Sequence, residues 1–279
     1  MFPRRGAIPY LLEGRFYRLA YVETGNPAAP PVLCVHGLTR TGRDFDELAG
    51  RLAERYLVVS PDLPGRGNSE WLADPALYQP QHYLAALAAL LAAIGRPVAW
   101  VGTSLGGICG MLACACPGAP VTRLVLNDIG PTVPAAAIRR IREYLAAAPE
   151  SFPDVAAVEA YIRQVNAPFG PMSGAQWRHL AVTSARPISG GQVRLHYDRA
   201  IIAAFGAVAG VDIDLWPVWE KITQPVLVVR GETSDLLLPE TLARMQAAGA
   251  RAVTIPECGH APALVDPLSQ GASAEFLAG

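Results

Sequence analysis

The stretch VAWVGTSLGG, residues 98–107, decides the fold of this chain. It begins with a short apolar run typical of a buried strand, passes through a G-x-S-x-G pentapeptide centred on Ser104, and continues into an apolar segment typical of a helix. Gly102 and Gly106 have no Cβ, so strand and helix can approach each other closely on either side of the serine. Such a turn raises the hydroxyl above the sheet, where a base can take its proton. The stretch therefore predicts a nucleophile elbow with Ser104 as the nucleophile.

Three other segments place matching chemistry just after predicted strands. Residues 32–38 form an apolar run that ends in a His-Gly-Leu triplet. Residues 225–235 predict a strand followed by a loop that carries Asp235, and residues 252–260 predict a strand followed by a loop that ends in His260. The chain order is thus serine, aspartate, histidine, which is the order found in hydrolases built around this type of elbow.

The other elements predict an α/β fold with a mostly parallel sheet that helices cover on both faces. Strands are expected at 16–22, 32–35, 57–61 and 124–127, and a helix at 80–94. From Gly130 to Asp214 the alternation of strand and helix stops, and helical patterns follow at 134–148, at 154–165 and after a capping box at 173–176. We therefore predict a core of residues 1–130 and 214–279 and a helical cap of residues 131–213 that covers the site.

These motifs resemble the α/β-hydrolase fold superfamily, in particular bacterial esterases and lactonases that carry a cap. The resemblance extends over nearly the whole chain and rests on His36-Gly37, the loop 61–69, the elbow at Ser104, Leu126-Asn127-Asp128, Asp235 and Gly259-His260. It implies a serine hydrolase that acts on a small-molecule substrate through an acyl-enzyme and needs no cofactor.

Four positions have direct roles in this chemistry. Ser104 is expected to attack a carbonyl carbon while His260 takes the hydroxyl proton. The backbone N–H groups of Leu38 and Leu105 are expected to form the oxyanion hole, one after an early strand and one directly after the nucleophile.

Two aspartates compete for the position beside His260. Asp128 follows the strand at 124–127, and Asp235 lies in a Gly-x-x-Ser-Asp loop of the kind that esterases commonly use. The loop type and the chain order favour Asp235 as the third member of a Ser104-His260-Asp235 triad. Asp128 is then expected to be a structural hydrogen-bond acceptor where the cap begins.

Arg40 and Trp177 are candidates for binding the substrate. Arg40 follows the oxyanion loop and can meet an anionic group, with a solvated surface arginine as the alternative. Trp177 can line the pocket from a cap helix, with a packed core aromatic as the alternative. His36 is expected to support the oxyanion loop rather than to transfer protons. No group of His, Cys, Asp and Glu in the sequence has metal-ligand spacing, so no metal is expected.

The residues around the site narrow the type of reaction. Haloalkane dehalogenases and epoxide hydrolases of this fold use a carboxylate nucleophile, whereas position 104 is serine. Related C–C hydrolases usually carry tryptophan after the histidine, where this chain has Ala261. Hydrolysis of a carboxylic ester or lactone is therefore expected. Hydrolysis of an amide, an enol-lactone or a C–C bond in a catabolic pathway stays open, as do a slow-turnover ligand receptor and a cofactor-free oxygenase or lyase.

The composition argues against several other classes of protein. The 279 residues carry a formal net charge of −1, which gives no basic surface for nucleic acid or for an anionic membrane. We find neither a signal-peptide core near the N-terminus nor an apolar run long enough to span a bilayer. The five cysteines are an odd number and lie mostly in apolar segments, which favours a reducing cytoplasm. A homodimer is an open alternative to a monomer.

Overall fold

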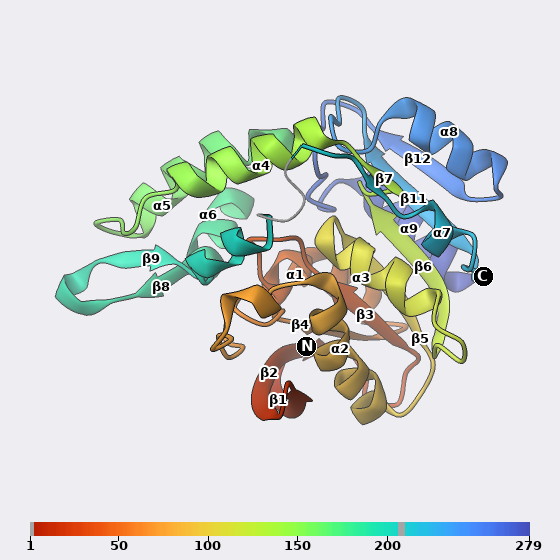
Figure 1. Ribbon diagram of the computed structural model, residues 1–279, viewed down its shortest axis with the longest axis horizontal. Coiled ribbons are helices and arrows are strands. Elements are labelled where there is room, and N and C mark those ends of the chain that lie inside the picture. The colour runs from red at the N-terminus through yellow and green to blue at the C-terminus, as the bar shows by residue number, and fades with distance from the viewer. Residues whose placement is uncertain (1–2, 206–209) are drawn as a thin grey trace.

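The computed structural model describes residues 3–205 and 210–279. Its centre is a sheet in which eight strands of the described residues are arranged in the order β1-β2-β4-β3-β5-β6-β11-β12 (Figure 1). The pairs from β4 to β12 in this order are parallel, whereas β2 pairs antiparallel with both β1 and β4. Their bounds are β1 (Arg4–Leu12), β2 (Arg15–Thr24), β3 (Pro31–Val35), β4 (Leu57–Pro61), β5 (Val98–Thr103), β6 (Val121–Asn127), β11 (Val226–Gly231) and β12 (Arg251–Ile255). The predicted α/β fold with a mostly parallel sheet is confirmed.

Helices cover both faces of this sheet. Leu33 and Val35 of β3 point into one core cluster, and Val32 and Cys34 point into another, as expected for a strand with period two that is buried on both sides. The first cluster includes side chains of α2 (Pro80–Ile94), α3 (Leu105–Cys114), α7 (Trp216–Trp219) and α8 (Pro239–Ala247). The second includes side chains of α1 (Asp46–Leu52) and α9 (Pro267–Ala278).

The first strand is an element that the sequence did not lead us to predict. β1 and β2 form a hairpin in which Leu12 pairs with Arg15, so that Glu13 and Gly14 make the two-residue turn. Both turn residues have positive φ, 47° and 73°, which is the backbone geometry of the tight turns preferred in hairpins. The hairpin extends the sheet on the side away from β11 and β12.

The segment between β6 and β11 contains an insertion whose two ends are joined. β7 (Thr132–Val133) pairs with β10 (Ile213–Asp214) in a short antiparallel ladder. Between them lie α4 (Ala135–Ala147), α5 (Val155–Val165), α6 (Gly174–Ser184), the hairpin of β8 (Ala185–Pro187) and β9 (Val193–Leu195), and short 3-10 turns η3 (Ala167–Phe169), η4 (Ser189–Gly191) and η5 (Arg199–Phe205). Two further 3-10 turns, η1 (Gly42–Phe45) and η2 (Pro75–Leu77), lie outside the insertion. The joined ends support our proposal that residues 131–213 act as a cap.

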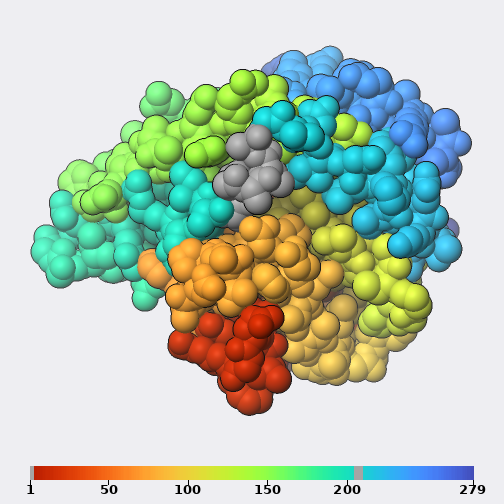
Figure 2. All heavy atoms as spheres, in the orientation of Figure 1, coloured from red at the N-terminus to blue at the C-terminus, as the bar shows by residue number. Residues whose placement is uncertain are grey.

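The insertion has a small core of its own and also packs against the rest of the molecule. Val158 and Ile162 of α5 meet Trp177 and Leu180 of α6 in a separate buried cluster. Figures 1 and 2 show α4 to α6 extending beyond the sheet, with the β8–β9 segment against the orange loop region that follows β4. There, the His196 carbonyl accepts a hydrogen bond from the Gly67 N–H.

Local signals set several helix boundaries. α2 occupies residues 80–94 as predicted and ends at Gly95, whose φ of 66° is left-handed. α6 opens with the predicted capping box, in which the Ser173 hydroxyl accepts from the Gln176 N–H and the Gln176 side chain accepts from the Ser173 N–H. Among the described residues, we find no helix with the length and apolar character needed to cross a membrane.

Candidate active site

Ser104 occupies the turn between β5 and α3, as the elbow predicts. Its backbone has φ 50° and ψ −113°, a conformation that costs a residue with a side chain about 1–3 kcal/mol. The flanking glycines make this turn fit, because a Cβ on Gly106 would collide with the carbonyl of Val35, and one on Gly102 with the carbonyl of Gly106. The predicted strand, turn and helix are therefore confirmed around Ser104.

Three side chains from separate loops form a continuous chain of hydrogen bonds. The Oγ of Ser104 lies 3.0 Å from Nε2 of His260, and Nδ1 of His260 lies 2.8 Å from Oδ2 of Asp128. Asp128 is fully buried and comes directly after β6, whereas His260 comes from the loop after β12. Because a carboxylate can only accept, Nδ1 carries the proton and Nε2 is left to accept from the serine hydroxyl. This arrangement can withdraw a proton from Ser104.

Asp235 does not contact His260, so our prediction for the acid is wrong. Its carboxylate is half exposed and accepts two hydrogen bonds from Arg140 of α4, at 2.6 and 2.8 Å. The neighbouring Ser234 turns inward instead, donates its hydroxyl to Asp128 at 2.6 Å, and accepts hydrogen bonds from the N–H groups of Leu236 and Leu237. These hydrogen bonds hold the Ser234 side chain inside the protein, and the side chain of the next residue, Asp235, faces outward.

The strand order contains the signal that would have identified Asp128. Thr103 and Asn127 are register partners on the adjacent parallel strands β5 and β6. The next residue of each strand, Ser104 and Asp128, therefore emerges at the same edge of the sheet. β11, which precedes Asp235, lies one strand further from β5. Chain order alone does not reveal this adjacency.

His36 and Arg66 hold the loop where one oxyanion donor is expected. Burial lowers the pKa of His36 to about 3, so the ring is neutral. Its Nε2 accepts from the Leu63 N–H at 2.9 Å, and its Nδ1 therefore donates to the Gly37 carbonyl at 2.6 Å. The Leu38 carbonyl accepts from Nε of the buried Arg66 at 2.8 Å. The supporting role predicted for His36 is confirmed. The peptide group that carries the Leu38 N–H is held at its carbonyl oxygen, that of Gly37, by the hydrogen bond from His36.

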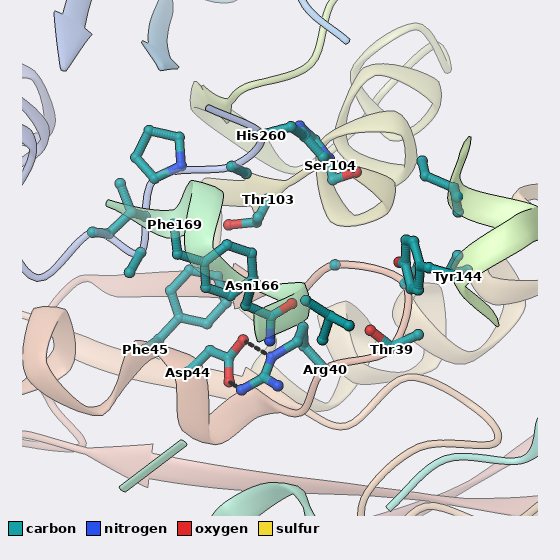
Figure 3. Close-up of a pocket in the computed structure, with 18 of the residues that line it drawn as sticks. Thr39, Arg40, Asp44, Phe45, Thr103, Ser104, Tyr144, Asn166, Phe169 and His260 are labelled. Atoms are coloured by element: carbon teal, nitrogen blue, oxygen red, sulfur yellow. Dashed lines mark hydrogen bonds and ion pairs between the residues drawn. The ribbon is translucent and has the colours of Figure 1, made fainter. Parts of the chain in front are cut away.

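A cavity opens beside Ser104 and His260, between the core and the insertion (Figure 3). Core residues including Leu38 and Phe45 form one part of its wall. The insertion contributes the rest, namely Arg140, Ile141, Tyr144, Val165, Asn166 and Phe169. Figure 3 shows Tyr144 beside Thr39 at the cavity. The wall thus combines apolar surface with a few hydroxyl and amide groups, as small-molecule sites commonly do.

Arg40 lines the cavity, but its side chain is neither solvated nor free. It is buried, and its guanidinium donates to both carboxylate oxygens of Asp44 at 2.8 Å and to the hydroxyl of Ser184 at 3.0 Å. Figure 3 shows Arg40 and Asp44 paired at the cavity wall. The positive charge of Arg40 is therefore largely compensated before any ligand enters.

Trp177 does not reach the cavity, so its predicted role in lining the pocket is wrong. It is only 6% exposed and packs with Val158 and Ile162 in the core of the insertion. The aromatic side chains that the insertion places at the cavity are Tyr144 and Phe169. Within the described residues, no group of three or more His, Cys, Asp or Glu side chains is arranged to hold a metal ion.

Known proteins are similar to this chain over almost its whole length. Residues 32–272 match the model of the alpha/beta hydrolase family. The chain is 42% identical to a 3-hydroxybutyrate-oligomer hydrolase of Cupriavidus necator, over 99% of this chain and 98% of that protein. It is 31% identical to a 2-(acetamidomethylene)succinate hydrolase of Mesorhizobium japonicum, over 78% of this chain and 76% of that one. The solved structure of an alpha/beta hydrolase from Novosphingobium aromaticivorans covers 98% of both chains with a TM-score of 0.87 and 36% identity. The chain therefore belongs to the alpha/beta hydrolase family.

Proposed function

We propose that this protein is a serine hydrolase that cleaves carboxylic esters, with Ser104, His260 and Asp128 as its catalytic triad. The observation that carries the proposal is the unbroken chain of hydrogen bonds from the Ser104 hydroxyl through the imidazole to a fully buried carboxylate. Ser104 and His260 line the cavity between the core and the insertion. A histidine held in one tautomer between an acceptor and a serine is what general-base activation of a nucleophile requires.

The reaction follows from these positions. Ser104 Oγ attacks the ester carbonyl carbon while Nε2 of His260 takes its proton, and Asp128 stabilises the imidazolium that results. The N–H groups of Leu38 and Leu105 receive the oxyanion, with an effect of about 3 kcal/mol for each donor in comparable sites. His260 then protonates the leaving alkoxide, and water repeats the sequence to release the acid from the acyl-enzyme.

We further propose short linear esters of hydroxyacids, such as 3-hydroxybutyrate oligomers, as substrates. This proposal rests on the 42% identity to the Cupriavidus necator protein over nearly the whole of both chains. The cavity wall suits such molecules, because Ile141, Val165 and Leu264 can contact methyl groups while Asn166 and Tyr144 can bond to ester or hydroxyl oxygens.

Amide hydrolysis is the second candidate, because a relative with 31% identity is named for an acetamido substrate. The lower identity and the smaller coverage of that relative place it behind ester hydrolysis. The test is to incubate the protein with a linear 3-hydroxybutyrate trimer and with the analogue in which both ester bonds are replaced by amides, and to follow monomer release by chromatography. We expect release from the ester only, and none from Ser104→Ala. Faster cleavage of the amide would reverse the assignment.

A further inference from the structure

We propose that Arg140 binds a free carboxylate of the substrate and that Asp235 holds the Arg140 side chain until such a substrate displaces it. This inference rests on the proposed function, and it defines the substrate class more narrowly as esters that also carry an acid group. The ion pair between α4 of the insertion and the loop after β11 would then be a site for selecting anionic substrates.

Arg140 is placed to reach a substrate in the cavity, whereas Asp235 lies outside the cavity wall. Arg140 lines the same cavity as Ser104 and His260, whereas Asp235 is not among the residues that form the cavity wall. Two hydrogen bonds, at 2.6 and 2.8 Å, join the guanidinium to both oxygens of Asp235. This two-point geometry is the one in which arginine recognises any carboxylate. A substrate carboxylate can therefore take the place of Asp235 without a change in the type of bonding.

The exchange is energetically accessible because the ion pair is exposed. The two side chains retain 42% and 50% of their accessible surface, and pairs of this kind contribute only about 0–1 kcal/mol to stability. Among the described residues, the Asp235 side chain bonds to Arg140 alone. Arg140 can thus exchange one carboxylate for another at little cost.

The other guanidinium of the cavity cannot serve in this way. Arg40 is buried and already donates to Asp44 and Ser184. Separating Arg40 from Asp44 would leave an uncompensated charge on a buried side chain, which is strongly unfavourable. Of the arginines that line the described cavity, Arg140 is therefore the one whose partner can be exchanged.

The chemistry of the proposed substrates supplies the matching group. A linear oligomer of 3-hydroxybutyrate ends in a free carboxylate, and a succinate, for which the second relative is named, also carries carboxylates. A cation at the cavity wall would favour such molecules over neutral esters, because a hydrogen bond to a charged group is stronger than one to a neutral group.

The test compares two substrates that share one scissile ester. One is the linear 3-hydroxybutyrate dimer with its free carboxylate, and the other is the primary amide of that dimer, which is similar in shape and uncharged. We expect Arg140→Gln to lower kcat/KM for the acid by about 10- to 100-fold, which is the size of the effect of losing a charge-assisted pair. The kcat/KM of the same variant for the amide should stay within about threefold of the wild-type value. Asp235→Asn should act in the opposite direction and lower KM for the acid only. Arg142→Gln, exposed on the same helix, is the matched control.

Binding measurements separate this inference from the proposed function. In the Ser104→Ala background, calorimetry should give a weaker Kd for the acid in Arg140→Gln and an unchanged Kd for the amide, whether or not the wild-type protein cleaves either molecule. If the wild-type protein hydrolyses both substrates equally well, ester hydrolysis stands and the carboxylate site is refuted. The site is also refuted if Arg140→Gln and Asp235→Asn weaken the binding of the acid and of the amide to the same extent. The ion pair would then only hold the insertion in place.

Discussion

The carboxylate of Asp128 accepts hydrogen bonds from three directions while it is fully buried. Gly231 donates its N–H to Oδ1 at 2.8 Å, and the Ser234 hydroxyl and the His260 ring both meet Oδ2. Together these donors satisfy the buried oxygens and fix the orientation of the carboxylate. Ser234 is therefore a positioning residue that acts on the imidazole through Asp128.

Replacement of Ser234 tests this positioning. Ser234→Ala removes a donor to Asp128 and the acceptor for the N–H groups of Leu236 and Leu237. We expect a loss of about 1–3 kcal/mol in the free energy of unfolding, measured with urea, and a fall of about tenfold in kcat with little change in KM. Ser234→Thr, which keeps the hydroxyl, should recover most of the kcat. An unaltered kcat in Ser234→Ala would show that Asp128 needs no help from this loop.

At the scale of elements, the packing of α3 against β5 and β3 determines the position of the nucleophile. Gly106 lies where the helix passes over the backbone of β3, and an added Cβ would meet the Val35 carbonyl. Main-chain atoms cannot move aside as a flexible side chain can, so the strand and helix would have to separate. The nucleophile elbow is thus a packing feature of three elements as well as a turn.

Two glycine substitutions separate packing from helix propensity. Gly106→Ala should destabilise the fold by about 3 kcal/mol or more and abolish activity, because the added methyl group overpacks a rigid contact. Gly50→Ala is the control, since Gly50 lies exposed within α1 with open space around it. This control should gain about 0.5–1 kcal/mol from higher helix propensity. Thermal unfolding of both variants gives the comparison, and equal effects of the two changes would contradict the packing argument.

The elements differ in how far the sequence could predict them. α2 and the capping box of α6 follow from signals within a few residues, and both occur where they were expected. The strand at 16–22 was predicted and is part of β2, whereas its partner β1 and the hairpin β8–β9 were missed. β1 contains Pro9, which argues against a strand, and β8 and β9 have only three residues each, too few to show a period of two. Asp128 and Trp177 were misassigned for another reason. Their roles depend on which strand lies beside β5 and which helix packs on α6, and these are long-range facts that local patterns do not contain.

On the scale of the whole molecule, polar contacts join the insertion to the core. The hydroxyl of Tyr78 donates to Asp198 at 2.7 Å, and Gln176 of α6 donates to Glu47 of α1 at 3.0 Å. His179 of α6 also contacts the core, through Asp46 and the Arg43 carbonyl. Such contacts hold the insertion in place over Ser104 and can be broken one at a time.

The contact of His179 should make stability depend on pH. Its hydrogen bond to Asp46 raises the pKa of the imidazole, so the protonated form is favoured in the folded state. A raised folded pKa contributes stability that is complete below the unfolded value of about 6.5 and is lost as pH rises through the folded pKa. The Tm difference between the wild type and His179→Gln should therefore be largest near pH 5.5 and shrink towards pH 9. The effect is small because the ring is partly exposed. A difference that grows with pH would contradict this assignment.

The most direct test of the proposed site compares the two aspartates on a neutral ester such as p-nitrophenyl butyrate. Asparagine in place of the acid of a triad favours the wrong imidazole tautomer and lowers kcat by about 10⁴-fold. The hydrogen bond between Asp128 and His260 predicts a loss of this order in Asp128→Asn and a kcat within about threefold of the wild type in Asp235→Asn, which only releases Arg140. Circular dichroism of both variants checks that they fold. The reverse ranking, with Asp235→Asn inactive and Asp128→Asn active, would contradict the triad of Ser104, His260 and Asp128.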